Sequence, residues 1–173
     1  MRHGESEYNV VSRINFDSRK EIHLTLRGKD QVEKTAGELS DVRFDAVYTS
    51  QFVRAQESAV IMTKGRRIKI KVDRRLNEFK FGFEGENVEV YYKLRAEAEE
   101  IVKFKIKDFE SFLDVKRRVS EFLQELKKQK YGRVLIVAHE AVVQAARTIF
   151  NELGDEDAFT TSIKNCQYFM FDM

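Results

Sequence analysis

Four short segments, far apart in the sequence, carry residue types that could bind and move a phosphoryl group. They are Arg2-His3-Gly4-Glu5-Ser6-Glu7-Tyr8-Asn9, Thr49-Ser50-Gln51-Phe52-Val53-Arg54-Ala55, Arg75-Leu76-Asn77-Glu78-Phe79-Lys80-Phe81-Gly82 and Ala138-His139. A phosphoryl group in transfer spreads negative charge over three oxygens, so a protein contributes mainly positioning and positive charge. The arginines and histidines of these segments suit that task if the fold brings them together.

Two of the four segments follow predicted strands. Residues 134–138 form a continuous apolar run, which is typical of a parallel strand covered by helices on both faces, and His139 comes directly after it. Residues 46–48 are a shorter run of the same kind, followed by Thr49 and Ser50. In such sheets the working residues gather beyond the carboxyl ends of the strands. We therefore expect the four segments to meet at one rim of the sheet.

The remaining apolar pattern alternates between strands and helices. Residues 68–72 alternate between apolar residues and lysine, which predicts a half-exposed strand near a sheet edge, and residues 168–171 predict the last strand. Four helical faces are predicted: Phe52, Ala55, Ala59 and Met62; Tyr91, Leu94, Ala98 and Ile101; Phe112, Val115, Val119, Phe122 and Leu126; and Val142, Ala145, Ala146, Ile149 and Leu153. Ser111 and Asp114 predict a capping box at the start of the long third helix. This alternation predicts an α/β fold, a three-layer sandwich whose mostly parallel central sheet is flanked by helices.

Length and composition favour a single domain over residues 1–173, with no repeat or linker to divide it. Lysine and arginine number 31 against 29 acidic residues, so the basic excess of a nucleic-acid surface is missing and no nucleic-acid partner is expected. We find no apolar run long enough for a membrane span and no leader, so no membrane partner is expected. The single cysteine, Cys166, cannot form an internal disulfide, which favours a cytoplasmic location.

Taken together, the four segments resemble the histidine phosphatase superfamily, the clan that also contains the cofactor-dependent phosphoglycerate mutases. The resemblance runs over nearly the whole chain. Leu24-Thr25-Leu26-Arg27-Gly28 is similar to the family's turn into its first helix, and Asp45-Ala46-Val47-Tyr48-Thr49-Ser50 to its second strand. Because all four segments occur in the family's order and at roughly its spacing, the sequence is identified as a member.

The resemblance implies how the central residues act. His3 would be the nucleophile, attacking phosphorus as a neutral imidazole and forming a phosphohistidine that water can cleave. Arg2 and Arg54 would clamp the phosphate oxygens with planar, always-charged guanidinium groups. His139 would donate a further hydrogen bond. No metal and no other cofactor is expected, because the two arginines and His139 would neutralise the charge.

Two further assignments have rivals. By resemblance, Glu78 would protonate the leaving oxygen and then activate the water. The family's acid lies on a variable loop, however, and Glu84 and Glu86 are close enough in sequence to compete. Asn9 would donate a neutral hydrogen bond to phosphate, or it only caps or turns the backbone. His23 matches no catalytic position and is interpreted as structural.

The sequence departs from the family pattern after the second histidine. The family usually has glycine there, and this chain has Glu140. A carboxylate beside the phosphate site would repel the substrate. We expect the Glu140 side chain to turn away and cap the helix that begins near Ala141, where a negative charge is favourable.

A second departure is at the start of the sequence. The family has an apolar strand immediately before Arg-His-Gly, in the middle of the sheet, whereas this sequence begins at Met1. We therefore expect the first central strand to be missing and the natural protein to start upstream. For the chain as given, we expect either a sheet that closes over the gap or a homodimer across open strand edges, with His3 on a poorly anchored terminus.

The expected function is hydrolysis of a phosphomonoester through a phosphohistidine on His3, with a small phosphorylated metabolite as substrate. The length resembles the short phosphatase branch of the clan. Two alternatives stay open, namely mutase-type phosphoryl transfer and a catalytically impaired phosphate-binding module. A cap or insertion at residues 79–109 would set substrate choice; its aromatic side chains either form a wall beside the leaving group or pack the cap onto the core.

Overall fold

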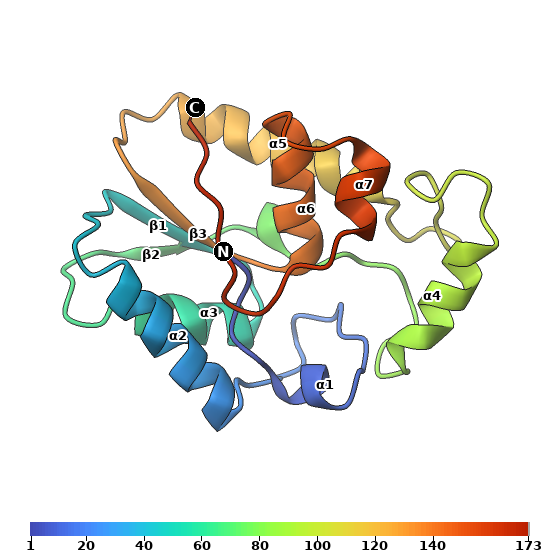
Figure 1. The fold of residues 1–173 in the computed structure, drawn as a ribbon, viewed down its shortest axis with the longest axis horizontal. Coiled ribbons are helices and arrows are strands. Elements are labelled where there is room, and N and C mark those ends of the chain that lie inside the picture. The colour runs from blue at the N-terminus through green and yellow to red at the C-terminus, as the bar shows by residue number, and fades with distance from the viewer. Residues whose placement is uncertain (173) are drawn as a thin grey trace.

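A small parallel sheet with helices on both faces organises the protein (Figure 1). The structure, a computed structural model, describes residues 1–172. Its strands are β1 (Ala46–Thr49), β2 (Ile70–Val72) and β3 (Val134–Val137), in the spatial order β2-β1-β3. All pairs are parallel, and β2 is an edge strand with exposed side chains, as the lysine alternation predicts.

The helices form two layers against this sheet. In chain order they are α1 (Glu7–Val10), α2 (Leu26–Glu38), α3 (Val53–Met62), the 3-10 turn η1 (Arg74–Leu76), α4 (Val88–Ala96), α5 (Phe112–Lys127), α6 (Glu140–Ile149) and α7 (Asp155–Thr160). The pair α2 and α3 packs below the sheet in Figure 1, and α5 and α6 pack above it, with α7 against α6. α4 stands away from the sheet. No helix of the described residues is long and apolar enough to cross a membrane.

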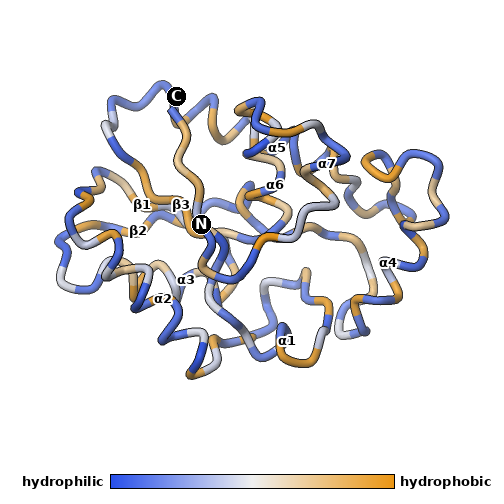
Figure 2. The backbone as a smooth tube through the Cα atoms, in the orientation of Figure 1, coloured by the Kyte–Doolittle hydropathy of each residue, from blue (hydrophilic) through white to orange (hydrophobic). Residues whose placement is uncertain are grey.

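Alternate residues of the central strands enter two hydrophobic clusters, one on each face of the sheet. Val47, Leu135 and Val137 pack with α2 and α3. Tyr48 and Ile136 pack against the cluster built by α5 and α6. Because β3 is covered on both faces, its residues are all apolar (Figure 2). The three-layer α/β architecture predicted from the sequence is confirmed.

The capping box at α5 is also confirmed, while two predicted helices are shorter than expected: α6 ends at Ile149, so the predicted Leu153 lies outside it, and α4 ends early as well. Ser111 Oγ accepts a hydrogen bond from Asp114 N, and an Asp114 carboxylate oxygen accepts one from Ser111 N at 3.0 Å. α4 ends at Ala96, so Ala98 and Ile101 of the predicted apolar face lie outside it. The acidic residues at 97, 99 and 100 explain this end, because negative charge is unfavourable at a helix C-terminus.

The first three residues lie alongside β3 and extend its parallel pairing. Ala138 N donates to Met1 O at 3.0 Å, and His3 N donates to Ala138 O at 2.9 Å. On the opposite side, Cys166 N donates to Arg2 O at 3.1 Å. His3 is 1% exposed. The expectation of a poorly anchored His3 is therefore wrong, because backbone hydrogen bonds hold this segment from both sides.

Residues 168–171 do not form the predicted last strand. The segment meets the chain start at Gln167, whose carbonyl accepts a hydrogen bond from Arg2 N at 3.0 Å, and beyond that point it diverges from β3 (Figure 1). Among the described residues, none pairs with it as an extended neighbour. The sheet has three strands in the described chain, so no other strand has closed the gap and that expectation is also wrong. A homodimer across this edge stays a prediction.

Candidate active site

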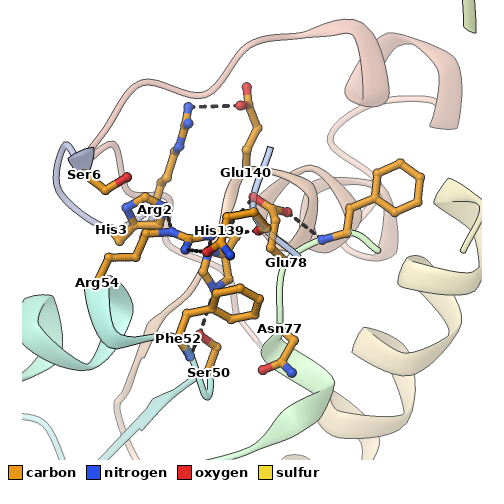
Figure 3. A network of polar contacts seen from close by, with 12 residues as sticks. Arg2, His3, Ser6, Ser50, Phe52, Arg54, Asn77, Glu78, His139 and Glu140 are labelled. Carbon is orange, nitrogen blue, oxygen red and sulfur yellow. Dashed lines mark hydrogen bonds and ion pairs between the residues drawn. The ribbon is translucent and has the colours of Figure 1, made fainter. Parts of the chain in front are cut away.

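A cavity of about 400 Å³ opens beyond the carboxyl ends of β1 and β3. Five of the six predicted site residues line it: Arg2, His3, Asn9, Arg54 and Glu78. The sixth, His139, does not line the cavity but is fully buried beneath it, with its ring centroid 5.1 Å from that of His3. We call His3, Arg54 and His139 the floor of the cavity (Figure 3).

His3 is held in the form that a nucleophile requires. Its Nδ1 lies 2.6 Å from the carbonyl oxygen of Gly4, which can only accept, so the proton sits on Nδ1 and Nε2 carries the lone pair. Nε2 accepts a hydrogen bond of 3.1 Å from Arg54 Nε. Burial, with the nearby charges of Arg54 and Arg2, holds the pKa of His3 well below its usual value. The ring is therefore neutral at pH 7.

Two glycines allow the loop around His3 to lie directly on the start of α2. A side chain on Gly4 would place its Cβ 2.5 Å from Gly28 O, and one on Gly28 would place it 2.0 Å from Glu5 O. Thr25 caps this helix by accepting a hydrogen bond from Gly28 N at 2.9 Å. Gly4 N donates to Ser58 Oγ on α3 at 3.1 Å. Gly4 and Gly28 are thus explained by close backbone contact, which no larger residue permits.

Arg54, in the first turn of α3, is 5% exposed and is oriented by Asn15. Its Nη1 donates to Asn15 Oδ1, and its Nη2 to Asn15 O at 3.4 Å. Burial lowers the pKa of Arg54 to about 10, so the guanidinium stays charged at neutral pH. Asn15, which sequence reasoning missed, is in turn fixed by Glu84, whose Oε1 accepts from Asn15 Nδ2 at 3.0 Å.

His139 is the N-cap residue of α6 and faces Arg54 rather than the open cavity. Its Nδ1 accepts from Arg54 Nη2 at 3.5 Å, so Nε2 carries the proton and donates to Ser50 Oγ at 2.7 Å. Burial and the charge of Arg54 hold the pKa of His139 well below its usual value. In this arrangement His139 helps to orient Arg54, and its role as a phosphate donor stays a prediction. Ser50, directly after β1, was expected at this rim of the sheet but was given no role in the site.

Glu78 follows the turn η1 and presents a carboxyl group beside the floor. Its Oε1 accepts from Phe79 N at 2.8 Å, and its Oε2 lies 4.0 Å from His139 Nδ1. Burial raises the pKa of Glu78, although Phe79 N and the charge of Arg54 act in the opposite direction. A raised pKa favours the protonated form that a general acid needs.

The two rivals of Glu78 lie elsewhere. Glu84 accepts hydrogen bonds from Phe16 N at 2.7 Å and Asp17 N at 2.9 Å, so its carboxylate organises the loop that carries Asn15. Glu86 is exposed and does not line the cavity.

Asn9 and His23 have contacts that match their simpler interpretations. Asn9 Oδ1 caps α1 by accepting from Ser6 N and Ser6 Oγ, each at 3.0 Å. The cap uses only the side-chain oxygen, so the amide nitrogen of Asn9 is the part that could reach a phosphate. His23 lies outside the cavity, where its Nδ1 is 2.8 Å from a carboxylate oxygen of Glu57.

Arg2 extends away from His3 and pairs with Glu140 (Figure 3). Arg2 Nη1 lies 3.0 Å from Glu140 Oε2 and also donates to Ile163 O. Glu140 Oε1 accepts from Ile163 N at 2.8 Å. The expectation that Glu140 caps a helix is therefore wrong. α6 begins at Glu140 itself, and its carboxylate instead binds the predicted phosphate ligand Arg2 at the cavity wall.

The mouth of the cavity is walled by α4 and the loops around it. We call Arg13, Tyr91, Tyr92 and Arg95 the outer wall of the cavity. Tyr91 also packs in the core with Phe79, so the aromatic residues of this segment both line the cavity and join it to the core. Within residues 1–172, no group of three or more histidine, cysteine, aspartate or glutamate side chains is arranged to hold a metal ion.

Comparison with known proteins agrees with this geometry. The family model described as histidine phosphatase superfamily (branch 1) matches residues 1–173. Phosphoserine phosphatase 1 of Hydrogenobacter thermophilus is 29% identical over 152 residues, covering 84% of this chain and 71% of that protein. The 2,3-bisphosphoglycerate-dependent phosphoglycerate mutase of Thermoplasma acidophilum is 27% identical over 186 residues, covering 100% and 85%. The crystal structure of the alpha-ribazole phosphatase from Shigella flexneri matches with a TM-score of 0.78 and 26% identity, covering 95% of this chain and 84% of that one.

The chain belongs to the histidine phosphatase superfamily. Its family and its phosphatase relatives make it a phosphoric monoester hydrolase, as the sequence predicts.

Proposed function

We propose that the protein hydrolyses a small phosphorylated metabolite in two steps, with His3 as the nucleophile. The observation that carries the proposal is the state of His3. Its ring is neutral and buried, and its Nε2 lone pair is aimed at Arg54 inside a cavity that also contains Glu78. Family membership supports the reaction class.

In the first step, His3 Nε2 attacks phosphorus. The P–N bond forms as the bond from phosphorus to the leaving oxygen breaks, and Glu78 gives its proton to that oxygen. Arg54 Nε, which donates to His3 Nε2 in the free protein, would donate to a phosphate oxygen instead. Because Asn15 already orients Arg54, little reorganisation is needed when charge develops.

In the second step, the Glu78 carboxylate takes a proton from water, which attacks the phosphohistidine. The P–N bond breaks, inorganic phosphate leaves, and His3 and Glu78 return to their starting protonation states. Arg2 Nη1 is engaged by Glu140 and Ile163 O, whereas Arg2 Nε has no hydrogen-bond partner among the described residues, so Arg2 could donate to a phosphate oxygen through Nε while Glu140 offsets part of its charge.

Mutase-type transfer is the second candidate, because the Thermoplasma acidophilum relative is a mutase. There the phosphoryl group on His3 would pass to a second hydroxyl group instead of water. Metal independence, a cytoplasmic location and the absence of nucleic-acid and membrane partners stay predictions.

Turnover of nitrophenyl phosphate tests the proposal. We expect steady release of inorganic phosphate that EDTA leaves unchanged and that His3→Ala abolishes. A requirement for added metal, or undiminished turnover by a folded His3→Ala protein, would contradict it. Transfer of the phosphoryl group to an added alcohol, with no release of inorganic phosphate, would favour the mutase reaction.

A further inference from the structure

The outer wall of the cavity carries cations that no acidic residue neutralises. Arg95, in the last turn of α4, and Arg13 both line the cavity. Within residues 1–172, neither side chain makes an ion pair or a hydrogen bond. By contrast, Arg2 is paired with Glu140, and Arg54 is held by Asn15.

The charges around the cavity do not balance. Its lining includes four arginines (Arg2, Arg13, Arg54 and Arg95) and two acids (Glu78 and Glu140). Under the proposed function, on which this inference rests, Glu78 enters the reaction protonated and the phosphoryl group occupies Arg54. With Arg2 and Glu140 compensating each other, Arg13 and Arg95 are left over at the mouth of the cavity. A ligand that fills the cavity is favoured if it brings negative charge to that end.

Arg95 is fixed in position, although it has no polar partner. Its guanidinium carbon lies 4.8 Å from the ring centroid of Phe159 and 5.1 Å from that of Tyr92. Stacking on aromatic faces orients the planar group while leaving its N–H donors free. Nearby, Tyr91 is 3% exposed, and its hydroxyl group has no hydrogen-bond partner among the described residues. A buried hydroxyl without a partner is costly, so a ligand that accepts its hydrogen bond would be favoured.

Arg95 and Tyr91 line the same cavity as the proposed general acid Glu78. Phe79 directly follows Glu78, and its ring centroid is 5.9 Å from that of Phe159, on which Arg95 stacks. Arg95 is thus connected to the proposed general acid through two packed rings. The leaving oxygen must lie against Glu78, and the cavity that Glu78 lines also reaches Tyr91 and Arg95, so the rest of the leaving group can contact them.

We propose that Arg95 and the Tyr91 hydroxyl group form a subsite for a second anionic group, carried by the leaving group of the substrate. The substrate class is then a phosphomonoester of an alcohol that also bears a carboxylate or a second phosphate. Arg95 binds this group through paired N–H donors, and Tyr91 donates one further hydrogen bond.

Phosphonates test the subsite, because they bind without being hydrolysed. The probes are phosphonobutyrate, the corresponding amide, in which a neutral carboxamide replaces the carboxylate, and propane bisphosphonate. Their dissociation constants are measured by calorimetry. A charge-assisted hydrogen-bond pair at Arg95 should make the wild-type protein bind the acid about 10- to 100-fold more tightly than the amide. Phosphonobutyrate and propane bisphosphonate each carry a second anionic group, and the tighter of these two probes identifies whether the subsite prefers a carboxylate or a second phosphate.

Variants on α4 separate recognition from structure. Arg95→Gln should bring the acid-to-amide ratio close to one, and Arg95→Lys should keep part of it because the charge remains. Lys93→Gln removes an exposed charge from the same helix, outside the cavity lining, and should leave the ratio as in the wild type. If Arg95 only joined α4 to α7, Arg95→Gln would lower the melting temperature and weaken acid and amide alike.

Equal binding of acid and amide by the wild type, or a ratio that survives Arg95→Gln, would overturn the subsite. The binding assay decides this even if the protein has no turnover. Nitrophenyl phosphate turnover separately decides the proposed function. If the protein hydrolyses nitrophenyl phosphate but binds acid and amide equally, only the subsite is rejected. If it binds the acid more tightly but does not hydrolyse nitrophenyl phosphate, only the proposed reaction is rejected.

Discussion

The floor and the outer wall of the cavity differ in how far the protein itself uses their polar groups. Every floor residue is buried and held by a neighbour: His3 by Gly4, Arg54 by Asn15, and His139 by Ser50. In the outer wall, on α4 and a nearby loop, Tyr91 is buried, whereas Arg13, Tyr92 and Arg95 are at least partly exposed. There Arg95 is stacked on rings but unpaired.

This difference separates reaction from recognition. A floor that is already oriented can stabilise only one kind of group, the phosphoryl group whose charge develops there. The outer wall has hydrogen-bond donors that the protein does not use. Its residues can therefore select the leaving group without taking part in phosphoryl transfer. Changes on the floor should therefore alter the rate for every substrate, and changes on the wall should alter the ratio between substrates.

The largest effect is expected for Glu78→Gln acting on alkyl phosphates. Loss of a general acid should slow these poor leaving groups by about 10²–10⁴-fold, and nitrophenyl phosphate much less, because nitrophenolate leaves without a proton. The measurement is kcat/KM for both substrates, which reports the steps up to phosphorylation of His3, whereas kcat also includes the cleavage by water that Glu78 assists for either substrate. Glu86→Gln, an exposed acid nearby, is the matched control. Equal slowing of the two substrates would remove Glu78 from the role of acid.

Arg54→Ala should lower kcat for nitrophenyl phosphate by about 10²–10³-fold, since a preorganised charge next to the phosphoryl group is lost. Arg54→Lys should recover little of the lost kcat, because a single ammonium group cannot contact both His3 and Asn15 as the guanidinium does. The exposed Arg67→Ala is the control for loss of a positive charge. Wild-type kcat in Arg54→Lys would show that charge alone suffices and that floor geometry is unimportant.

Glu140→Gln probes the boundary between floor and wall. The variant keeps an oxygen that can accept from Ile163 N but removes the charge that holds Arg2. The Arg2–Glu140 pair is partly exposed, so we expect only a small gain, with KM and the inhibition constant of inorganic phosphate lowered up to about fivefold. Weaker phosphate binding would instead mean that Glu140 keeps Arg2 in a productive place.

The floor histidines predict a dependence of stability on pH. The folded-state pKa values of His3 and His139 are depressed, so below their unfolded pKa of about 6.5 the unfolded chain binds more protons than the folded one. Stability should rise with pH through this window and be lost as the pH falls, by up to about 1.4 kcal/mol per pH unit for each histidine.

His23 should make the stability of the fold depend on pH in the opposite direction. Its exposed ring pairs with Glu57, which raises its pKa, so its contribution is present at low pH and is lost as the pH rises through the folded pKa. Urea unfolding between pH 5.5 and 7.5 measures the net slope, and NMR titration separates the three rings. A His3 or His139 ring that titrates with an ordinary pKa would contradict the buried, preorganised floor.

The sequence allows prediction of the strand ends beside the floor from short-range rules, whereas the roles of His3 and Arg54 followed only from the resemblance to the family. The apolar runs that become β1 and β3 end at Thr49-Ser50 and at His139, and parallel strands bring these ends together. Asn15 was missed because residues 10–23 show no apolar periodicity. A signal was nevertheless present, since a polar residue between Ile14 and Phe16 suggests a buried amide with a specific partner.

Features that depend on distant partners could not be predicted in the same way. The ion pair of Glu140 depends on where Arg2 lies relative to α6 and on a backbone amide from residue 163. Residues 168–171 have the apolar pattern of a strand, but a strand also needs an extended neighbour, which sequence patterns do not provide. Likewise, the stacking of Arg95 on Phe159 joins α4 to α7, two elements whose docking no local pattern indicates.

Trapping the covalent intermediate tests the central claim most directly. In Glu78→Gln, radiolabelled nitrophenyl phosphate should still phosphorylate His3, because its leaving group needs no acid, while hydrolysis slows because no base activates water. We predict acid-labile, base-stable label on the peptide that contains His3, and none in the double variant that also carries His3→Ala. Label on another residue, or label that persists without His3, would contradict the account.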